Sequence, residues 1–372
     1  MCVLSYKIIV FKNYEELIMS TESGMTDINV NDRIEKCSIW FKRFSEQAKD
    51  SKIYNYLSNK ISTDQEILEI VSQANFSQPV PNLFYASINF LLIKDSKALL
   101  RSYYPSFGGE LPIGDDFFIE FKKYAIKNKN IINDLCNSRL VQTNEVRRST
   151  LFAKGFSIAC NSLKINDVGL IDLGCSGGLN LLFDKYHSKY SDGTSLGDIN
   201  SKLTLNCKIT NNAKNLDFLP KVHKRIGFDL NPLNLINEDD ENWAFSLIWP
   251  DQLQRIENFR NAVDLRKNNE IELFKGSTFS DIEPSLVNLL SKDITPCFMH
   301  SFTFNQLSKD ERLVFEDGLK KVSKIGRVLE FSIEWLSTET PEFNCEVYED
   351  GEKIKTIYIA KCDQHGQWIE LK

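Results

Sequence analysis

A short apolar segment that runs directly into a glycine-rich turn constrains this chain more than any other feature. The apolar segment covers residues 168–173, and the turn that follows it contains Gly174, Gly177 and Gly178. Where a nucleoside ligand approaches the backbone closely, side chains must be absent and positive φ must be inexpensive, and glycine meets both conditions. The segment therefore predicts a buried strand, a ligand-binding turn and then a helix at about 178–187.

The pattern of the chain after residue 168 alternates short apolar runs with amphipathic segments. Strands separated by helices of this length imply βαβ units and a parallel sheet. Residues 344–372 instead indicate two or three antiparallel strands around a turn at Asp350 and Gly351. The fold class is therefore α/β, a Rossmann-like, mostly parallel sheet with antiparallel C-terminal strands. The predicted strands cover 168–173, 225–230, 271–275, 294–300 and 326–333, and further helices cover about 240–267, 282–291 and 308–322.

The chain before the sheet has a helical pattern. Thr63 and Glu66 have the spacing of a capping box at the start of one of these helices. A chain of 372 residues is long enough for two domains. We predict an N-terminal extension at 1–31, an all-helical cap domain at 32–160 and an α/β domain at 161–372. Within the latter, residues 188–222 read as a small antiparallel insertion beside the pocket.

Composition narrows the classes of partner. The net charge is −6, whereas proteins that bind nucleic acid usually present a basic face to the phosphates, so we expect a small-molecule substrate rather than a nucleic acid. The nine cysteines form no CxxC pair and their number is odd, which favours reduced thiols and a cytoplasmic protein. No segment is long and apolar enough for a membrane span, and Lys7 and Lys12 interrupt any signal-peptide core. The oligomeric state is not predicted.

The spacing of the turn separates cofactor types. It is neither the G-x-G-x-x-G of a dinucleotide site nor the Gly-Lys-Ser/Thr ending of a phosphate-binding P-loop. The order Asp172, Gly174, Ser176, Gly178 at alternate positions resembles the first motif of methyltransferases that use S-adenosylmethionine (SAM), with Ser176 in place of the middle glycine. The alternative is a glycine-rich turn that holds no ligand.

A carboxylate at the end of the next strand supports a nucleoside ligand. Asp229 ends the strand at 225–230, where an acid can accept both ribose hydroxyls. The alternative is that Asp229 only caps a helix. Methyltransferases often place an acid that binds the adenine amino group after the third strand, and here Ser277 stands in that place.

Several other segments resemble an uncharacterised bacterial family, domain of unknown function 2332, over about residues 40–372. The family is similar in fold to SAM-dependent methyltransferases, and this chain departs from its usual pattern at Arg147 and Ser277. The motifs that carry the resemblance are Gln142–Ser149, Gly178-Leu179-Asn180-Leu181 with Asp184 and Tyr186, Gly227–Asn234, Trp243, Ile248–Gln252 with Arg255, Tyr104-Pro105-Ser106, and His365-Gly366 with Trp368.

Polar residues just before the first strand are candidates for ligand binding. Arg148, which matches the family pattern, could bind the methionine carboxylate through two hydrogen bonds, and a surface salt bridge is the alternative. We also predict substrate contacts from Gln142, Asn144, Glu145 and Tyr104. Helix capping is the alternative for the first three, and core packing is the alternative for the tyrosine.

Two residues at strand ends are candidates for catalysis. His300 ends the predicted fourth strand, and its pKa naturally lies near neutrality, so it could act as a general base. A buried structural histidine is the alternative, and Glu334 at the end of the fifth strand is a second candidate. The four histidines lack HxH or HExxH spacing, so no metal site is predicted.

The leading hypothesis is a SAM-dependent methyltransferase that acts on an unidentified small molecule. The alternative is a regulatory protein that binds SAM or a nucleoside on a methyltransferase-like scaffold without methyl transfer, because fold does not imply function.

Overall fold

The structure is a computed structural model that describes residues 29–143, 145–211, 218–276, 282–283, 286, 288–289, 293–335 and 340–372. The chain divides into two compact units. The helical unit comprises residues up to Thr143 together with Glu238–Glu257, and the α/β unit comprises Asn144–Asn237 together with Asn258–Lys372.

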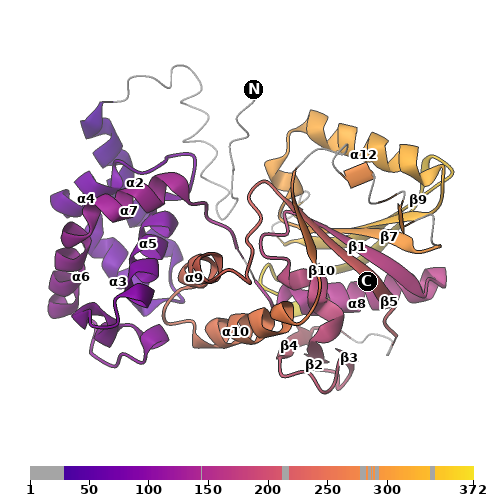
Figure 1. The fold of residues 1–372 in the computed structure, drawn as a ribbon, viewed down its shortest axis with the longest axis horizontal. Helices are drawn as coiled ribbons and strands as arrows, with labels where there is room; N and C mark the ends of the chain where they lie inside the picture. The colour runs from indigo at the N-terminus through magenta and orange to yellow at the C-terminus, as the bar shows by residue number, and fades with distance from the viewer. Residues whose placement is uncertain are drawn as a thin grey trace. The chain divides into compact units, whose positions relative to one another are not determined.

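The helical unit is organised around an apolar helix, α5 (Val80–Lys94), which is buried on almost all sides (Figure 1). Tyr85 of this helix packs with Phe41, with ring centroids 5.8 Å apart, and with Phe121 at 6.3 Å. No helix in the described ranges is long and apolar enough to cross a membrane. The other elements are α2 (Val30–Gln47), α3 (Lys52–Ile61), α4 (Gln65–Val71), η1 (Leu99–Tyr103), η2 (Pro105–Phe107), α6 (Asp115–Lys127), α7 (Lys129–Ser138) and α9 (Glu238–Ser246), with α10 (Leu253–Lys267) beginning here and continuing into the α/β unit.

The N-cap of α4 differs from the predicted one. Asp64, not Thr63, caps the helix, and its Oδ1 accepts a hydrogen bond from the Ile67 amide at 3.1 Å. Its other oxygen lies 2.7 Å from Nζ of Lys122, so the aspartate gains an ion pair as well as a cap. The predicted capping box is therefore wrong.

The α/β unit contains one large sheet, in which the structure describes eleven strands in the order β3-β2-β4-β11-β10-β9-β8-β7-β1-β5-β6 (Figure 1). The block β6-β5-β1-β7-β8 is parallel throughout, and β9 and β10 follow it as an antiparallel hairpin. The prediction of a mostly parallel α/β sheet with antiparallel C-terminal strands is confirmed. The strands are β1 (Asp167–Leu173), β2 (His187–Tyr190), β3 (Ser195–Gly197), β4 (Thr204–Ile209), β5 (Lys221–Asp229), β6 (Glu272–Lys275), β7 (Thr295–Ser301), β8 (Val328–Glu334), β9 (Glu342–Glu349), β10 (Glu352–Cys362) and β11 (Trp368–Leu371).

Helices cover both faces of this sheet (Figure 1). On one face lies α8 (Arg148–Leu163), whose Phe156 stacks on Phe331 of β8 with ring centroids 3.8 Å apart. On the other lies α12 (Lys309–Ser323), whose Phe315 meets Phe298 of β7 edge-on at 5.3 Å. Large apolar rings on both faces of neighbouring strands explain why these strands read as nearly continuous apolar runs.

The division into units differs from the predicted domains. The helix at 148–163 belongs to the α/β unit, because its aromatic face packs on the sheet. Conversely, α9 belongs to the helical unit, where Trp243 packs against Phe90 and donates a hydrogen bond from Nε1 to the Leu140 carbonyl at 3.0 Å. Helical periodicity reports that a helix has an apolar face but not which core receives it.

Two predicted helices are altered. After the glycine-rich turn, the chain forms a 3₁₀ helix, η3 (Leu179–Lys185), rather than an α-helix, and Leu182 within it is not helical. The carbonyl oxygens of Leu179 and Leu181 accept hydrogen bonds from the Tyr186 hydroxyl and from Arg225, so tertiary donors bind groups that an α-helix would use. The helix predicted at 240–267 is broken between α9 and α10 around Pro250, as proline requires.

The predicted insertion at 188–222 is only partly antiparallel. Strand β2 pairs antiparallel with β3 but parallel with β4, and β4 joins the sheet by parallel pairing with β11. These strands lie against α8 and η3 rather than in the parallel block. The helix predicted at 282–291 lies largely outside the described residues.

Candidate functional site

Three residues of the turn after β1 adopt left-handed backbone conformations. Gly174 has φ of 72°, Ser176 of 50° and Gly178 of 75°. The amides of Gly174 and Cys175 both donate to the Phe228 carbonyl of β5, at 2.8 and 3.2 Å, so the turn is fastened to the neighbouring strand. Glycine suits this backbone because the left-handed region is inexpensive for it, whereas serine is strained there.

The glycine-rich turn contacts Asp229, the residue predicted to bind the ribose. Oδ2 of Asp229 accepts a hydrogen bond from the Ser176 amide at 2.9 Å, and its Oδ1 accepts one from the Asn231 amide at 2.8 Å. The carboxylate therefore stands against the glycine-rich backbone, as two features serving one ligand require. Its two bonds to amides also hold the turn in place.

Asp172 is a buried carboxyl group that lacks a hydrogen bond within the described part of the chain. It is 5% exposed, and burial raises its pKa to about 8. Asp229 raises this pKa further, while His300 and Arg148 lower it. Asp172 is therefore an acid held largely in its neutral form until a positive group comes beside it.

Arg148, the first residue of α8, reaches the end of β7. Its Nε donates to the Gln364 carbonyl at 2.8 Å, and Nη1 donates to the Ser301 hydroxyl at 3.3 Å. The guanidinium also lies 4.5 Å from the centre of the Phe302 ring. These contacts fix a buried positive charge close enough to Asp172 to affect its pKa.

The hydroxyl of Ser176 is an unusual group in this turn. The residue is 5% exposed, and its Oγ has no hydrogen-bond partner among the residues that the structure describes. Burying a hydroxyl without a partner costs about 1–3 kcal/mol, and the left-handed backbone adds strain. The group is thus available to a ligand that reaches the turn.

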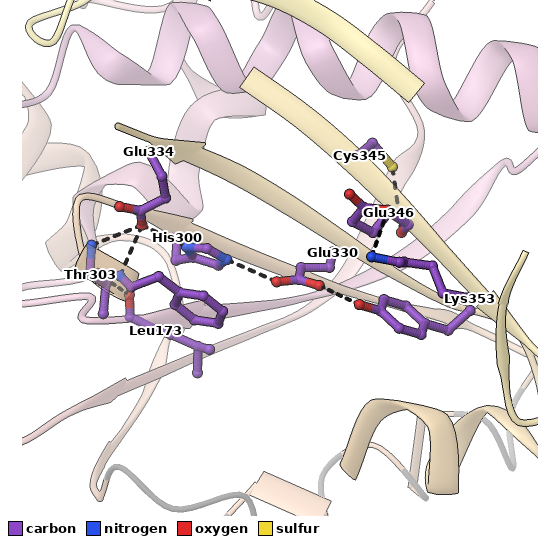
Figure 2. A network of polar contacts seen from close by, with 10 residues as sticks. Leu173, His300, Thr303, Glu330, Glu334, Cys345, Glu346 and Lys353 are labelled. Atoms are coloured by element: carbon purple, nitrogen blue, oxygen red, sulfur yellow. Dashed lines mark hydrogen bonds and ion pairs between the residues drawn. The ribbon is translucent and has the colours of Figure 1, made fainter. Parts of the chain in front are cut away.

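His300 does not lie on the same face of the sheet as Asp172. Side chains alternate along a strand, and Phe298 and Leu173 belong to the apolar cluster under α12, so His300 faces α12 while Asp172 faces α8. Nδ1 of His300 lies 2.8 Å from Glu334, and Nε2 lies 3.2 Å from Glu330 (Figure 2).

This arrangement bears on the predicted catalytic roles. His300 is fully buried, and both of its ring nitrogens are bound by carboxylates, so neither can take a proton from a bound molecule. Burial alone would lower its pKa, but the hydrogen bonds with Glu330 and Glu334 raise it to about 9. The geometry therefore favours the structural alternative for His300 over the role of a general base.

The second catalytic candidate, Glu334, is also held by the protein. Its Oε1 accepts hydrogen bonds from His300 and from the amides of Thr303 and Phe304, at 2.9 and 3.0 Å (Figure 2). Three donors on one oxygen suit a carboxylate that anchors a turn.

The predicted substrate residues are divided between the two units. Tyr104 is fully buried in the core of the helical unit, with its ring 6.0 Å from that of Phe117, so core packing accounts for it and the predicted substrate contact is not supported. Gln142 belongs to the helical unit. Glu145 belongs to the α/β unit, where Oε1 accepts from the Arg147 amide. Asn144 and Ser277 lie outside the described residues.

The sequence analysis did not identify Thr303, which lies beside the glycine-rich turn, or Glu330, which contacts His300. Thr303 donates from Oγ1 to the Leu173 carbonyl at 3.0 Å, and a Cβ on Gly174 would lie only 2.5 Å from that hydroxyl oxygen. Glu330 was read only as part of a strand. Neither lies in a motif, because each acts through residues distant in the chain. The described residues contain no group of three or more metal-ligating side chains.

Comparison with known proteins identifies a family without an assigned reaction. The model of the family described as "Uncharacterized protein conserved in bacteria (DUF2332)" matches residues 39–371. The chain therefore belongs to this family, and the resemblance drawn from its motifs is confirmed. Searches of curated proteins and of solved structures found no match.

Proposed function

We propose that this member of the DUF2332 family is a SAM-dependent methyltransferase that acts on an unidentified small molecule. The observation that carries the proposal is the 2.9 Å contact between the Ser176 amide and Asp229. It puts a glycine-rich backbone and a carboxylate side by side at the carboxyl edge of two parallel strands. Nucleoside ligands in α/β proteins are bound by that combination.

The position of the turn in the sheet supports a ligand there. Within the parallel block, β1 has β5 on one side and β7 on the other, so the chain order of the strands is third, second, first, fourth, fifth. The direction of strand order reverses beside β1, and in open α/β sheets ligands bind outside the carboxyl ends of the strands at this point. Asp172 is the second-last residue of β1, and Ser301 is the last residue of β7.

The charges of the site fit the methionine end of SAM. The buried carboxyl of Asp172 would ionise beside the ammonium group, and Arg148 would bind the carboxylate. Asp229, a carboxylate held against the turn by two backbone amides, would accept the ribose hydroxyls. SAM supplies an electrophilic methyl group on a sulfonium, and the residues of this chain would bind and orient the reactants for in-line transfer.

A second function, a regulatory protein that binds SAM or a nucleoside without methyl transfer, is favoured by one observation. The candidate base His300 is held on both sides by glutamates and faces the opposite side of the sheet from Asp172. A site that binds the cofactor but offers no base would sense it rather than consume it.

Calorimetry of the full chain with SAM and with S-adenosylhomocysteine tests the binding that both functions share. We expect saturable binding that Asp229→Asn weakens at least tenfold, because the neutral amide is a poorer acceptor for hydroxyls and backbone amides. Asp264→Asn, an exposed aspartate of α10 in the same unit, is the matched control and should bind as the wild type does. Absence of binding by a folded wild-type protein would reject both functions.

Methyl transfer separates the two functions once binding is established. Wild-type protein incubated with radiolabelled SAM and a fraction of small metabolites should release S-adenosylhomocysteine in proportion to a labelled small product. Binding with neither product above the level of Asp229→Asn would reject the methyltransferase and leave the regulatory protein.

A further inference from the structure

A buried row of polar side chains on the α12 face links the middle of the sheet to the glycine-rich turn (Figure 2). We infer that Glu330, His300 and Glu334 form a positioning device that holds the turn at Thr303 and Phe304, and through it the backbone at Leu173 and Gly174, in the conformation of the site. Its effect on a cofactor rests on the proposed function, but the device itself does not.

The first step is the charge on the imidazole. Glu330 and Glu334 approach opposite ring nitrogens of His300, at 3.2 and 2.8 Å. Ionised carboxylates only accept hydrogen bonds, so both nitrogens must carry protons for both contacts to be hydrogen bonds. The imidazolium then supplies the positive charge that two carboxylates in a dry interior require.

The second step is the anchoring of the turn. The same Oε1 of Glu334 that faces His300 also accepts the amides of Thr303 and Phe304, at 2.9 and 3.0 Å. The Phe304 ring stacks on the imidazole, with centroids 3.8 Å apart and planes 11° from parallel. The turn is thus held by its backbone amides and by one of its side chains.

The third step connects the turn to the site. From this turn, the Thr303 hydroxyl donates to the carbonyl of Leu173, the last residue of β1, at 3.0 Å. The hydroxyl also occupies the space where a side chain on Gly174 would begin, so the two segments are in direct contact. If the turn at Thr303 and Phe304 moved, the backbone at Leu173 and Gly174, which leads into the glycine-rich turn, would lose this support.

The far end of the row fixes the orientation of the device. The Tyr348 hydroxyl of β9 donates to Oε2 of Glu330 at 2.9 Å, so Glu330 receives a proton donor on each oxygen. The titratable groups that contact His300 on its own face are Glu330 and Glu334 from β8, while Asp172 of β1 lies on the opposite face, close enough for His300 to lower its pKa. The 3₁₀ helix η4 (Phe304–Gln306) and α12 contribute the rings of Phe304 and Phe315. Glutamates dominate this set, so the imidazolium persists at neutral pH.

Nitrogen NMR of the histidine rings tests the charge in the wild-type protein. The chain has only four histidines, and replacing His187, His223 and His365 one at a time by glutamine assigns the fourth without disturbing it. We expect His300 to keep protons on both ring nitrogens at pH 8. A neutral His300 ring at that pH would overturn the inference.

Hydrogen exchange tests the anchoring. Glu334→Gln keeps the shape of the side chain but replaces a charged acceptor with a neutral one, so exchange of the amides within residues 301–307 should become about tenfold faster. Glu349→Gln removes a glutamate of β9 that pairs with Arg327 at 2.9 Å, and it should leave these amides unchanged. Unchanged exchange in Glu334→Gln would also overturn the inference.

The cofactor provides a third, separable result. If wild-type protein binds SAM, Glu334→Gln should weaken binding about tenfold, matching the faster exchange, while Glu349→Gln should not. Unchanged SAM affinity in Glu334→Gln would refute the coupling to the site. If wild-type protein does not bind SAM, the proposed function fails, and the NMR and exchange results still decide whether the device exists.

Discussion

Replacing Asp172 with asparagine should stabilise the protein relative to wild type, by an amount that grows as the pH rises from 4 to 8. The folded protein raises the pKa of this acid from the ordinary 3.8 to about 8, chiefly by burial. Above pH 4 the unfolded chain releases this proton while the folded protein retains it, so the wild-type protein loses stability until the pH passes 8. Asparagine is neutral throughout and escapes this loss.

The magnitude follows from proton linkage. One proton retained by the folded state alone changes the free energy of unfolding by about 1.4 kcal/mol per pH unit. Relative to wild type, Asp172→Asn should therefore gain about 3 kcal/mol between pH 5 and pH 7, and the gain should level off above pH 8. Any fixed effect of the amide shifts the whole curve but not its slope.

Urea denaturation of both proteins at several pH values from 4 to 9 measures this slope. Asp264→Asn is the control, since its exposed carboxylate is hydrated in the folded and unfolded chains alike. A difference between Asp172→Asn and wild type that stays constant from pH 5 to pH 8 would refute the account of Asp172 as a buried neutral acid.

Three further changes test the turn and its neighbours. In thermal unfolding, Gly174→Ala should lower the free energy of unfolding by about 3 kcal/mol, because the strain of a left-handed backbone adds to a clash with Thr303. Gly193 also has a left-handed backbone, but a Cβ there would meet open space, so Gly193→Ala should lower the free energy of unfolding by only about 1 kcal/mol. Ser176→Gly should raise the melting temperature by about 3 °C, since it removes both the strain and an unpartnered buried hydroxyl, and a fall in stability would contradict this. Arg148→Lys should weaken SAM binding about tenfold in calorimetry while the fold persists, because lysine cannot reproduce the forked contacts of the guanidinium.

Much of the fold was readable from the sequence. The strands at 168–173 and 326–333 were found nearly at their observed bounds, because a short apolar run between turn residues is a local signal. The glycine-rich turn and Asp229 were paired correctly for a related reason. Both follow strands of a parallel sheet, whose carboxyl ends share one edge whatever the details of packing.

Other features depended on tertiary structure. The sequence placed His300 at a strand end but could not assign it to the α12 face or to Glu330 and Glu334, which lie 30 and 34 residues away. Strand register decides such contacts, and one position of shift would turn each side chain to the other face. The same limit explains why the sequence predicted an α-helix where the structure has the 3₁₀ helix η3. There Arg225 of β5 donates to the Leu181 carbonyl, which an α-helix would have used within itself. Sequence determined which segments form strands and where the chain can turn, because those preferences are local, and only the folded sheet decided which buried charges meet.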